Sequence, residues 1–313
     1  MAMCLLGLGR PQRARAHVDA ARSYYDATSN HERIVDCMAL EIAYAVQTQQ
    51  VVSAVEVGLQ ALIACRALEP PVPVLEVRIL GLLASAYVTS GDWLAAIGAY
   101  EVAIKVAGPL FDMRRRARLL NDAAIAYQEI GRFDVATRHI TQAVALFEAV
   151  REPVMLAKAE NNFGVLLLAM RDLAAARPHL ERSLALCVET GLEAGRAHAL
   201  LSLAELCVAE GRLEPARRFA KHALDFAERL HEQDSRAASH FWLGQIAASA
   251  GDAHESDEEF ALAIKCWEAA GALERLARCH ETYADVLEKR GEIELANAEL
   301  KTALAVRSRS PVS

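Results

Sequence analysis

Histidine, cysteine and carboxylate side chains are the groups in this chain that can carry catalysis or hold a metal, and their spacing matches none of the common catalytic motifs. The sequence contains no GxGxxG, P-loop, GxSxG or HExxH pattern. His231 and Glu232 begin an HExxH pattern, but Ser235 stands where the second histidine belongs. We therefore predict that the chain is not an enzyme and uses no cofactor and no metal.

The histidines and cysteines are scattered along the chain. No two of the 10 histidines lie four residues apart on one predicted helix face with a carboxylate, which zinc enzymes require. We expect structural or surface roles for His139, His179 and His222. The 7 cysteines form no CxxC pair, and Cys187 and Cys207 are expected to be small core residues. An odd, scattered set argues for a reducing compartment, so we predict a cytoplasmic protein.

Composition excludes several classes of function. The 313 residues are 53% apolar and 24% charged, which allows a large core and excludes disorder as the main state. With 34 Lys and Arg against 41 Asp and Glu, the net charge is −7, so direct binding of nucleic acid is not expected. No uninterrupted apolar run is long enough for a transmembrane helix, so no membrane association is predicted.

The elements that position any site repeat every 40 residues. Aligned positions carry Gly or a substitute at 9, 49, 91, 131, 171, 211, 251 and 291, with two extra residues near Pro70. Apolar residues are spaced by three, four and seven on both sides of each position, which predicts two amphipathic helices joined by a tight turn. Glycine suits such a turn because it adopts positive φ without strain. The sequence predicts about eight helical hairpins.

Two columns of small residues accompany the turns. Seven residues before them stand Ala84, Ala124, Gly164, Ala204, Gly244 and Ala284. Five residues after them stand Ala14, Ala54, Ala96, Ala136, Ala176, Ala216, Ser256 and Ala296. Small side chains at both places let the two helices of a hairpin lie close together. Because one hairpin cannot bury both of its faces, neighbouring hairpins must stack.

These columns, with a large apolar residue eight before the turn and Tyr87 and Tyr127 four before it, resemble the tetratricopeptide repeat (TPR). The resemblance covers residues 1–305 and is closest to the long-repeat TPR sensor regions of bacterial regulators. It implies an all-α, right-handed superhelix, a single solenoid over 1–305 followed by a tail over 306–313. Family resemblance by itself does not fix the function.

In TPR stacks the first helices line a concave groove, through positions 13, 10, 9, 6 and 3 before each turn. In the hairpins that turn at 171, 211 and 251 these positions include Leu168, Glu205, Val208 and Trp242. From the same positions we predict nine peptide-binding residues: Arg118, Asn121, Gln128, Lys158, Asn161, Asn162, His198, Phe241 and Gln245.

Each residue type in this set has a distinct expected role. The amides of Asn121, Asn161 and Asn162 can clamp the backbone of an extended peptide, or else bond a neighbouring helix. Arg118 and Lys158 are suited to a carboxylate, and the aromatic pair at 241 and 242 to an apolar side chain. The hairpin that turns at Gly211 lacks the Lys and Arg of the chaperone-type carboxylate clamp, which argues against a C-terminal EEVD-type ligand.

The leading hypothesis is a non-catalytic interaction scaffold that holds a peptide or protein segment in its concave groove. The alternative is the peptide-sensing region of a bacterial transcription regulator whose helix-turn-helix part is missing or on another chain. A third hypothesis is an accessory region of an enzyme. Only eight residues precede Gly9, too few for a full first helix, so we also expect a partner or a further domain at the N-terminal end.

Overall fold

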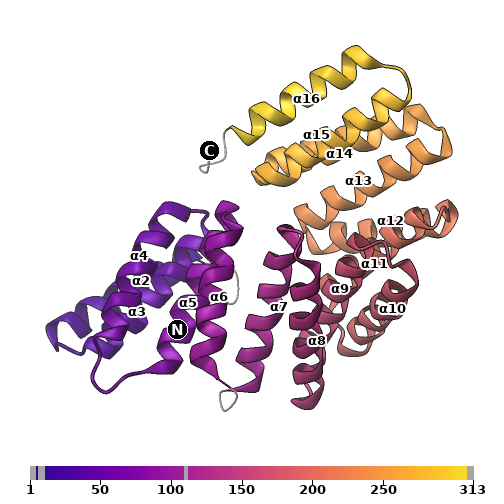
Figure 1. The fold of residues 1–313 in the computed structure, drawn as a ribbon. Helices are drawn as coiled ribbons and strands as arrows, with labels where there is room; N and C mark the ends of the chain where they lie inside the picture. Colours follow the sequence, from indigo (N-terminus) through magenta and orange to yellow (C-terminus); the bar gives the residue numbers. More distant parts are fainter. Residues whose placement is uncertain (1–4, 6–10, 109–111, 309–313) are drawn as a thin grey trace. The chain divides into compact units, whose positions relative to one another are not determined.

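The computed structural model describes residue 5 and residues 11–108 and 112–308, and these residues form helices and short turns (Figure 1). The predicted turn at Gly9 and residues 309–313 of the predicted tail (306–313) lie outside this part. The chain divides into two compact units, Met1–Val150 (unit 1) and Arg151–Ser313 (unit 2), and each is described by itself. The prediction of an all-α fold built from helical hairpins is confirmed.

The described residues of unit 1 form one single helix, α2, followed by three hairpins. Its helices are α2 (Pro11–Ala27), α3 (His31–Gln47), α4 (Val51–Arg66), α5 (Pro73–Ser90), α6 (Trp93–Ala107), α7 (Met113–Glu129) and α8 (Phe133–Ala149). The helices pack in sequence order as the pairs α3 with α4, α5 with α6 and α7 with α8, and the first helices α3 and α5 also touch each other. Such side-by-side first helices are the arrangement that the repeat predicted.

Unit 2 contains four hairpins. Its helices are α9 (Pro153–Ala169), α10 (Leu173–Thr190), α11 (Glu193–Ala209), α12 (Leu213–Leu230), α13 (Gln233–Ala250), α14 (Ala253–Ala270), α15 (Leu273–Lys289) and α16 (Ile293–Arg307). The first helices contact one another in the order α9, α11, α13 and α15. Each second helix, α10, α12, α14 or α16, packs on the first helix of its own hairpin, and Figure 1 shows these hairpins following one another in this unit.

Every described turn inside a hairpin contains one residue with positive φ. These residues are Gln49, Gly91, Gly131, Arg171, Gly211, Gly251 and Gly291. The backbone bonds at Arg171 match those at the glycine turns, since Arg171 N donates to Leu168 O and Asp172 N to Leu167 O, both at 2.9 Å. The hydrogen bonds of the αL helix cap therefore hold this conformation even where a side chain makes it less favourable.

The small-residue columns are buried, as the spacing predicted. Ala84, Ala204 and Ala284 are at most 1% exposed, and Ala176 and Ser256 are fully buried. In two hairpins of unit 2 the residue seven before the turn lies opposite the residue nine after it, as Gly164 does to Leu180 and Gly244 to Phe260. A β-carbon added to Gly164 would lie only 2.5 Å from Cγ of Leu180, so the large leucine requires a glycine opposite it. At the same two positions the next hairpin, α11 and α12, has two residues of intermediate size, Ala204 and Ala220. The two positions share one volume.

Three hairpins of unit 2 carry a histidine–carboxylate pair at the same place. One member of the pair stands eleven residues before the turn and the other eight residues after it. In the first of these hairpins Glu160 Oε2 lies 2.6 Å from His179 Nδ1. His240 and Glu259 form the same pair at 2.7 Å, and His280 and Glu299 at 2.5 Å. Each pair joins the first helix of a hairpin to the second across a partly buried interface. The structural role expected for His179 is therefore what its contacts show.

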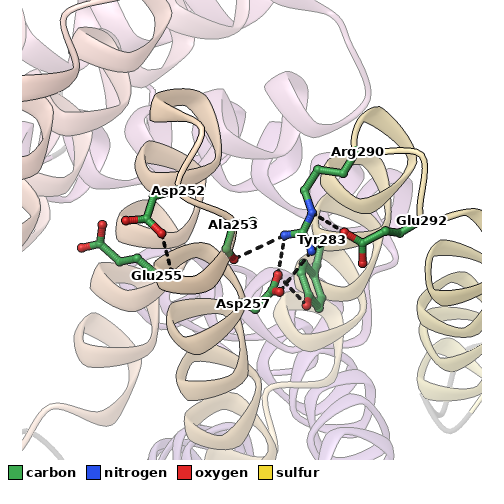
Figure 2. Close-up of polar contacts among 7 residues, drawn as sticks. All are labelled: Asp252, Ala253, Glu255, Asp257, Tyr283, Arg290 and Glu292. Carbon is green, nitrogen blue, oxygen red and sulfur yellow. Dashed lines mark hydrogen bonds and ion pairs between the residues drawn. The ribbon is translucent and has the colours of Figure 1, made fainter.

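The last two hairpins are tied together by Arg290, at the end of α15 (Figure 2). Its Nη1 and Nη2 donate to the two oxygens of Asp257 on α14 at 2.6 and 3.1 Å, and its Nε donates to Glu292 at 2.7 Å. The Tyr283 hydroxyl donates to Asp257 at 3.0 Å. The hydrogen bond from Arg290 is the main reason that the pKa of Asp257 lies below its usual value.

We expect this network to contribute to stability above about pH 4 and to be lost in acid. A carboxyl group with a lowered folded-state pKa stabilises the fold above its unfolded pKa of about 3.9, and the contribution disappears as the pH falls through the folded pKa. Asp257→Asn is expected to lower the free energy of unfolding by about 1 kcal/mol at pH 7, since solvent screens a carboxylate that is 40% exposed. Urea titrations between about pH 7 and pH 3 should show the difference shrinking below about pH 4. The control is Asp285→Asn, at an exposed position on the same helix as Tyr283. It should change neither the free energy of unfolding at pH 7 nor its dependence on pH.

One described helix, α5, is long and apolar enough to cross a bilayer, and 39% of its most apolar window is buried in unit 1. Arg78 of this helix bonds Asp36 of α3 at 2.7 Å, and Glu76 bonds Arg66 of α4 at 2.7 Å. Ile79 is fully buried. These contacts are those of a core helix in a helical stack.

Candidate functional site

A pocket of about 340 Å³ opens on the first helices of unit 2, where α9, α11 and α13 lie side by side. It is lined by Leu168, Ala169, Arg171, Glu205, Val208, Ala209, Trp242 and Gln245. Five of these, Leu168, Glu205, Val208, Trp242 and Gln245, stand at the groove positions that the repeat register predicts. The helical period brings them to one face because residues three and seven apart on a helix point the same way.

The walls of the pocket are mainly apolar, and its polar lining residues are Arg171, Glu205 and Gln245. Leu168 and Val208 belong to the packed cores between neighbouring hairpins, and their outer surfaces form the walls. The Trp242 indole lies edge-on to the ring of Phe241, with 5.5 Å between centroids. A mainly apolar cavity with a small number of polar groups is the usual form of a ligand site.

Glu205 is the acidic group of the pocket. Burial raises the pKa of its carboxyl group, and the positive charges of Arg278 and Arg171 act in the opposite direction. Within the described part of the chain, this carboxylate forms no hydrogen bond and no ion pair. A partly buried carboxyl group without a bonding partner is a strong acceptor for a donor group that enters the pocket.

The predicted residues of unit 2 differ in how they are placed. Gln245 lines the pocket. Lys158 on α9 and His198 on α11 are exposed, and Asn161 and Asn162 on α9 are half-buried. The side-chain oxygen of Asn161 is buried and accepts no hydrogen bond from the described residues. Because seven residues of helix rise about 10 Å, Asn161 lies two turns from the pocket wall at Leu168 on the same face of α9.

Phe241 lies inside an aromatic cluster. Its ring centroid is 6.0 Å from that of Phe260 and 5.7 Å from that of Trp267, both edge-to-face. These contacts place it between α13 and α14, where it supports Trp242 at the pocket from behind. Trp242 and not Phe241 is the aromatic residue that lines the pocket.

The predicted residues of unit 1 all lie on α7. Arg118 is exposed and Gln128 is half-buried. Asn121 is only 5% exposed, and its amide Nδ2 donates to Asp122 Oδ1 at 2.9 Å. The amide of Asn121 is therefore engaged within the helix that carries it.

Sequence reasoning did not single out Arg171 or Glu205 as binding residues. Arg171 stands at a turn position where most of the other hairpins have glycine. This exception could have indicated that its side chain has a role outside the turn. Glu205 stands at a groove position, but the sequence gives no sign that its carboxyl group lacks an internal partner.

The cysteines and the acidic clusters offer no second site in the part of the chain that the structure describes. The six cysteines there are free and buried, and burial raises the pKa of the Cys187 and Cys207 thiols and brings that of Cys279 to about 12. Thiols held in the protonated form are poor nucleophiles. No group of three or more His, Cys, Asp or Glu residues among those described is placed to hold a metal ion.

Residues 155–229, which include α9 to α12 almost completely, match the family model described as tetratricopeptide repeat. This chain has the tetratricopeptide repeat fold. No curated protein matches the TPR chain at the level of sequence.

Several solved structures share this TPR fold over nearly the whole chain. Aspartyl phosphate phosphatase F from Bacillus subtilis is similar with a TM-score of 0.77 and 12% identity, covering 93% of this chain and 76% of that one. A Rap protein complexed with competence and sporulation factor is similar with a TM-score of 0.71 and 14% identity, covering 98% and 96%. The Rap conjugation gene regulator of the plasmid pLS20, in complex with the Phr* peptide, has a TM-score of 0.62 and 13% identity, covering 93% and 95%. At these identities the likeness concerns the fold.

Proposed function

We propose that unit 2 binds an extended segment of a peptide or protein across α9, α11 and α13, with one side chain of the ligand in the pocket. The observation that carries the proposal is the pocket itself, about 340 Å³ with apolar walls and one unpaired acid, on the face where the TPR register places the groove. This volume is at the lower end of ligand pockets in proteins and suits one or two side chains.

The chemistry of the pocket favours a side chain with an apolar stem and a donor at its end. Leu168 and Val208 would contact the stem, and the Glu205 carboxylate would accept hydrogen bonds from the end group. A lysine or arginine side chain meets both conditions, and the Trp242 ring adds a face that attracts a cation. Arg171 at the rim is available to a carbonyl or carboxylate of the same ligand.

The amides of α9 and α13 supply contacts to the ligand backbone in this proposal. The buried side-chain oxygen of Asn161 has no donor among the described residues, so a peptide N–H would satisfy it. The 10 Å or so along α9 from Asn161 to Leu168 corresponds to about three residues of extended chain. Gln245 and Lys158 lie at the two ends of this path, one in the pocket and one on the first half of α9.

We propose that the protein is a non-catalytic interaction module of the cytoplasm. The odd, scattered set of cysteines supports a reducing compartment, and the raised pKa values of the buried Cys187 and Cys207 thiols argue against a cysteine nucleophile. A regulatory version, in which a peptide signal changes the shape of the stack, is favoured by the neighbours whose structures contain competence and sporulation factor or the Phr* peptide. Scattering measured with and without ligand separates the two versions, because a passive scaffold keeps its radius of gyration.

A library of short random peptides displayed on phage tests the proposal. We expect selected peptides to carry a lysine or arginine, and calorimetry to show binding about tenfold weaker for Asn161→Ala/Asn162→Ala and for Glu205→Gln. The thermal midpoint of Glu205→Gln and of the single variant Asn161→Ala should stay close to that of the natural chain, since neither the side-chain oxygen of Asn161 nor the Glu205 carboxylate forms a hydrogen bond with the described residues.

The matched control is Lys221→Ala/His222→Ala, two exposed residues on the second helix α12. It should bind as the natural chain does. The proposal is wrong if this control weakens binding equally, or if the loss in the asparagine variant is matched by an equal loss of stability, which would make the asparagines structural.

A further inference from the structure

Helix α16 is the last helix of unit 2 (Figure 1), and several of its large apolar side chains are exposed. Among them, Ile293, Leu300 and Leu304 are 51%, 41% and 66% exposed and form an apolar stripe. Their spacings of seven and four residues place them on one face of the helix, with exposed Asn297 between them. Large aliphatic side chains in such a continuous row usually mark an interaction surface.

One residue of the stripe, Leu300, stands at a position that the preceding hairpins bury. Nine residues after the turn, Leu180, Ala220 and Phe260 are all fully buried, whereas Leu300 at the same position is exposed. In those hairpins the second helix packs against the first helix of the next hairpin, as α10 does on α11, α12 on α13 and α14 on α15. The face of α16 therefore has the register of a surface that packs against another helix.

Two opposite charges lie beside the stripe. Glu294 and Lys301 are exposed, seven residues apart on one side of it, and neither forms an ion pair or hydrogen bond within the described chain. If a second α16 ran parallel to the first about a two-fold axis, Glu294 and Lys301 would each face the opposite flank of the partner helix, which carries Ala296 and Ala303, and would gain no partner of opposite charge. If it ran antiparallel about a two-fold axis, Glu294 of each copy would meet Lys301 of the other, and Ile293 would meet Leu304.

We propose that the occupant of this face is α16 of a second copy of the chain, packed antiparallel in a symmetric dimer. This partner is selected because both the charged and the apolar residues of α16 find a complementary residue on an antiparallel copy of the same helix. Asn297, near the centre of the stripe, would lie close to the two-fold axis, where a polar residue fixes the register of a helix pair. The face is one helix wide, so the dimer is expected to be weak and to dissociate on dilution.

Sedimentation equilibrium over about a hundredfold range of concentration tests the proposal. We expect a reversible dimer for the natural chain and a monomer at all concentrations for Leu304→Glu. The charge variants Glu294→Lys and Lys301→Glu should each dimerise about tenfold more weakly, because two like-charge pairs replace two opposite ones. An equimolar mixture of the two should recover the affinity as a heterodimer, since every pair is then opposite in sign.

The mixture separates this interface from a general effect on folding, because a damaged fold is not repaired by mixing. Leu94→Glu on α6 of unit 1, where the leucine is 73% exposed, is the matched control and should leave the dimer intact. A monomer for the natural chain, a dimer that survives Leu304→Glu, or a dimer lost in Leu94→Glu would each overturn the proposal. Failure of heterodimer rescue would overturn the antiparallel register.

Discussion

Removing the two donors that hold Glu160 is expected to destabilise unit 2 by about 3–5 kcal/mol. Glu160 is fully buried on α9, with His179 Nδ1 at 2.6 Å from one oxygen and Arg182 Nη1 at 2.7 Å from the other. Without these donors a negative charge remains in the core with far less compensation, which is one of the most costly changes that a fold can undergo.

The double substitution His179→Phe/Arg182→Met tests this with little loss of volume. The His179 ring lies 4.2 Å from that of Phe163, and phenylalanine keeps an aromatic ring there, while methionine keeps part of the apolar stem of Arg182. Urea unfolding at pH 7, followed by circular dichroism, measures the change in free energy.

Adding Glu160→Leu to the same double variant provides the control. Replacing a buried charge and all of its partners with apolar residues is often nearly neutral, so we expect the triple variant to recover most of the lost stability. If the double variant loses less than about 1 kcal/mol, water reaches the carboxylate and the pairing has little energetic weight.

Gly164→Ala is expected to destabilise unit 2 by about 1–3 kcal/mol, although alanine is a better helix former than glycine. The added methyl group would meet the buried Leu180 side chain, with 2.5 Å to its Cγ. Either Leu180 leaves its preferred rotamer or α9 and α10 separate. Both changes disturb a close-packed interface.

Two comparisons test whether the clash with Leu180 is the cause, because a glycine-to-alanine substitution should not be destabilising in either of them. Gly98 is also helical but has no atom within 4 Å of an added β-carbon, so Gly98→Ala should stabilise unit 1 by about 0.5–1 kcal/mol. In a Leu180→Ala background, Gly164→Ala should no longer be destabilising, since the pair then matches Ala204 and Ala220 of the next hairpin. Additive effects of the two substitutions would show that the positions do not share one volume.

The repeat pattern was sufficient to predict the architecture. Because a helix has a fixed period, the spacing of apolar residues and of the turn glycines determines where helices begin and end, and α3 to α16 follow that pattern. The pattern extends to turns without glycine, as Gln49 and Arg171 show. Arg151 and His231, which adopt positive φ between hairpins, were not predicted, since the helix-capping bonds there compensate for an unfavourable residue type.

The groove register was also available from the sequence, and it includes five of the eight residues that line the pocket. Whether the nine predicted residues bind a ligand stays a prediction. What the register does not give is the state of each polar group: Asn121 and Asn161 stand at equivalent positions, yet one amide donates to Asp122 and the other leaves its oxygen unpaired.

The helices, their order and the faces that they turn toward each other follow from the sequence, because these features depend on local geometry that repeats every 40 residues. The pairing of side chains across helices became visible only in the folded structure. The histidine–carboxylate pairs lie 19 residues apart in the chain, and their polarity is reversed between the hairpins of His179 and His240. Such contacts depend on rotamers and on the packing of neighbouring helices, so the helical period alone does not predict them, and the same packing leaves the Glu205 carboxylate without a hydrogen-bond partner among the described residues.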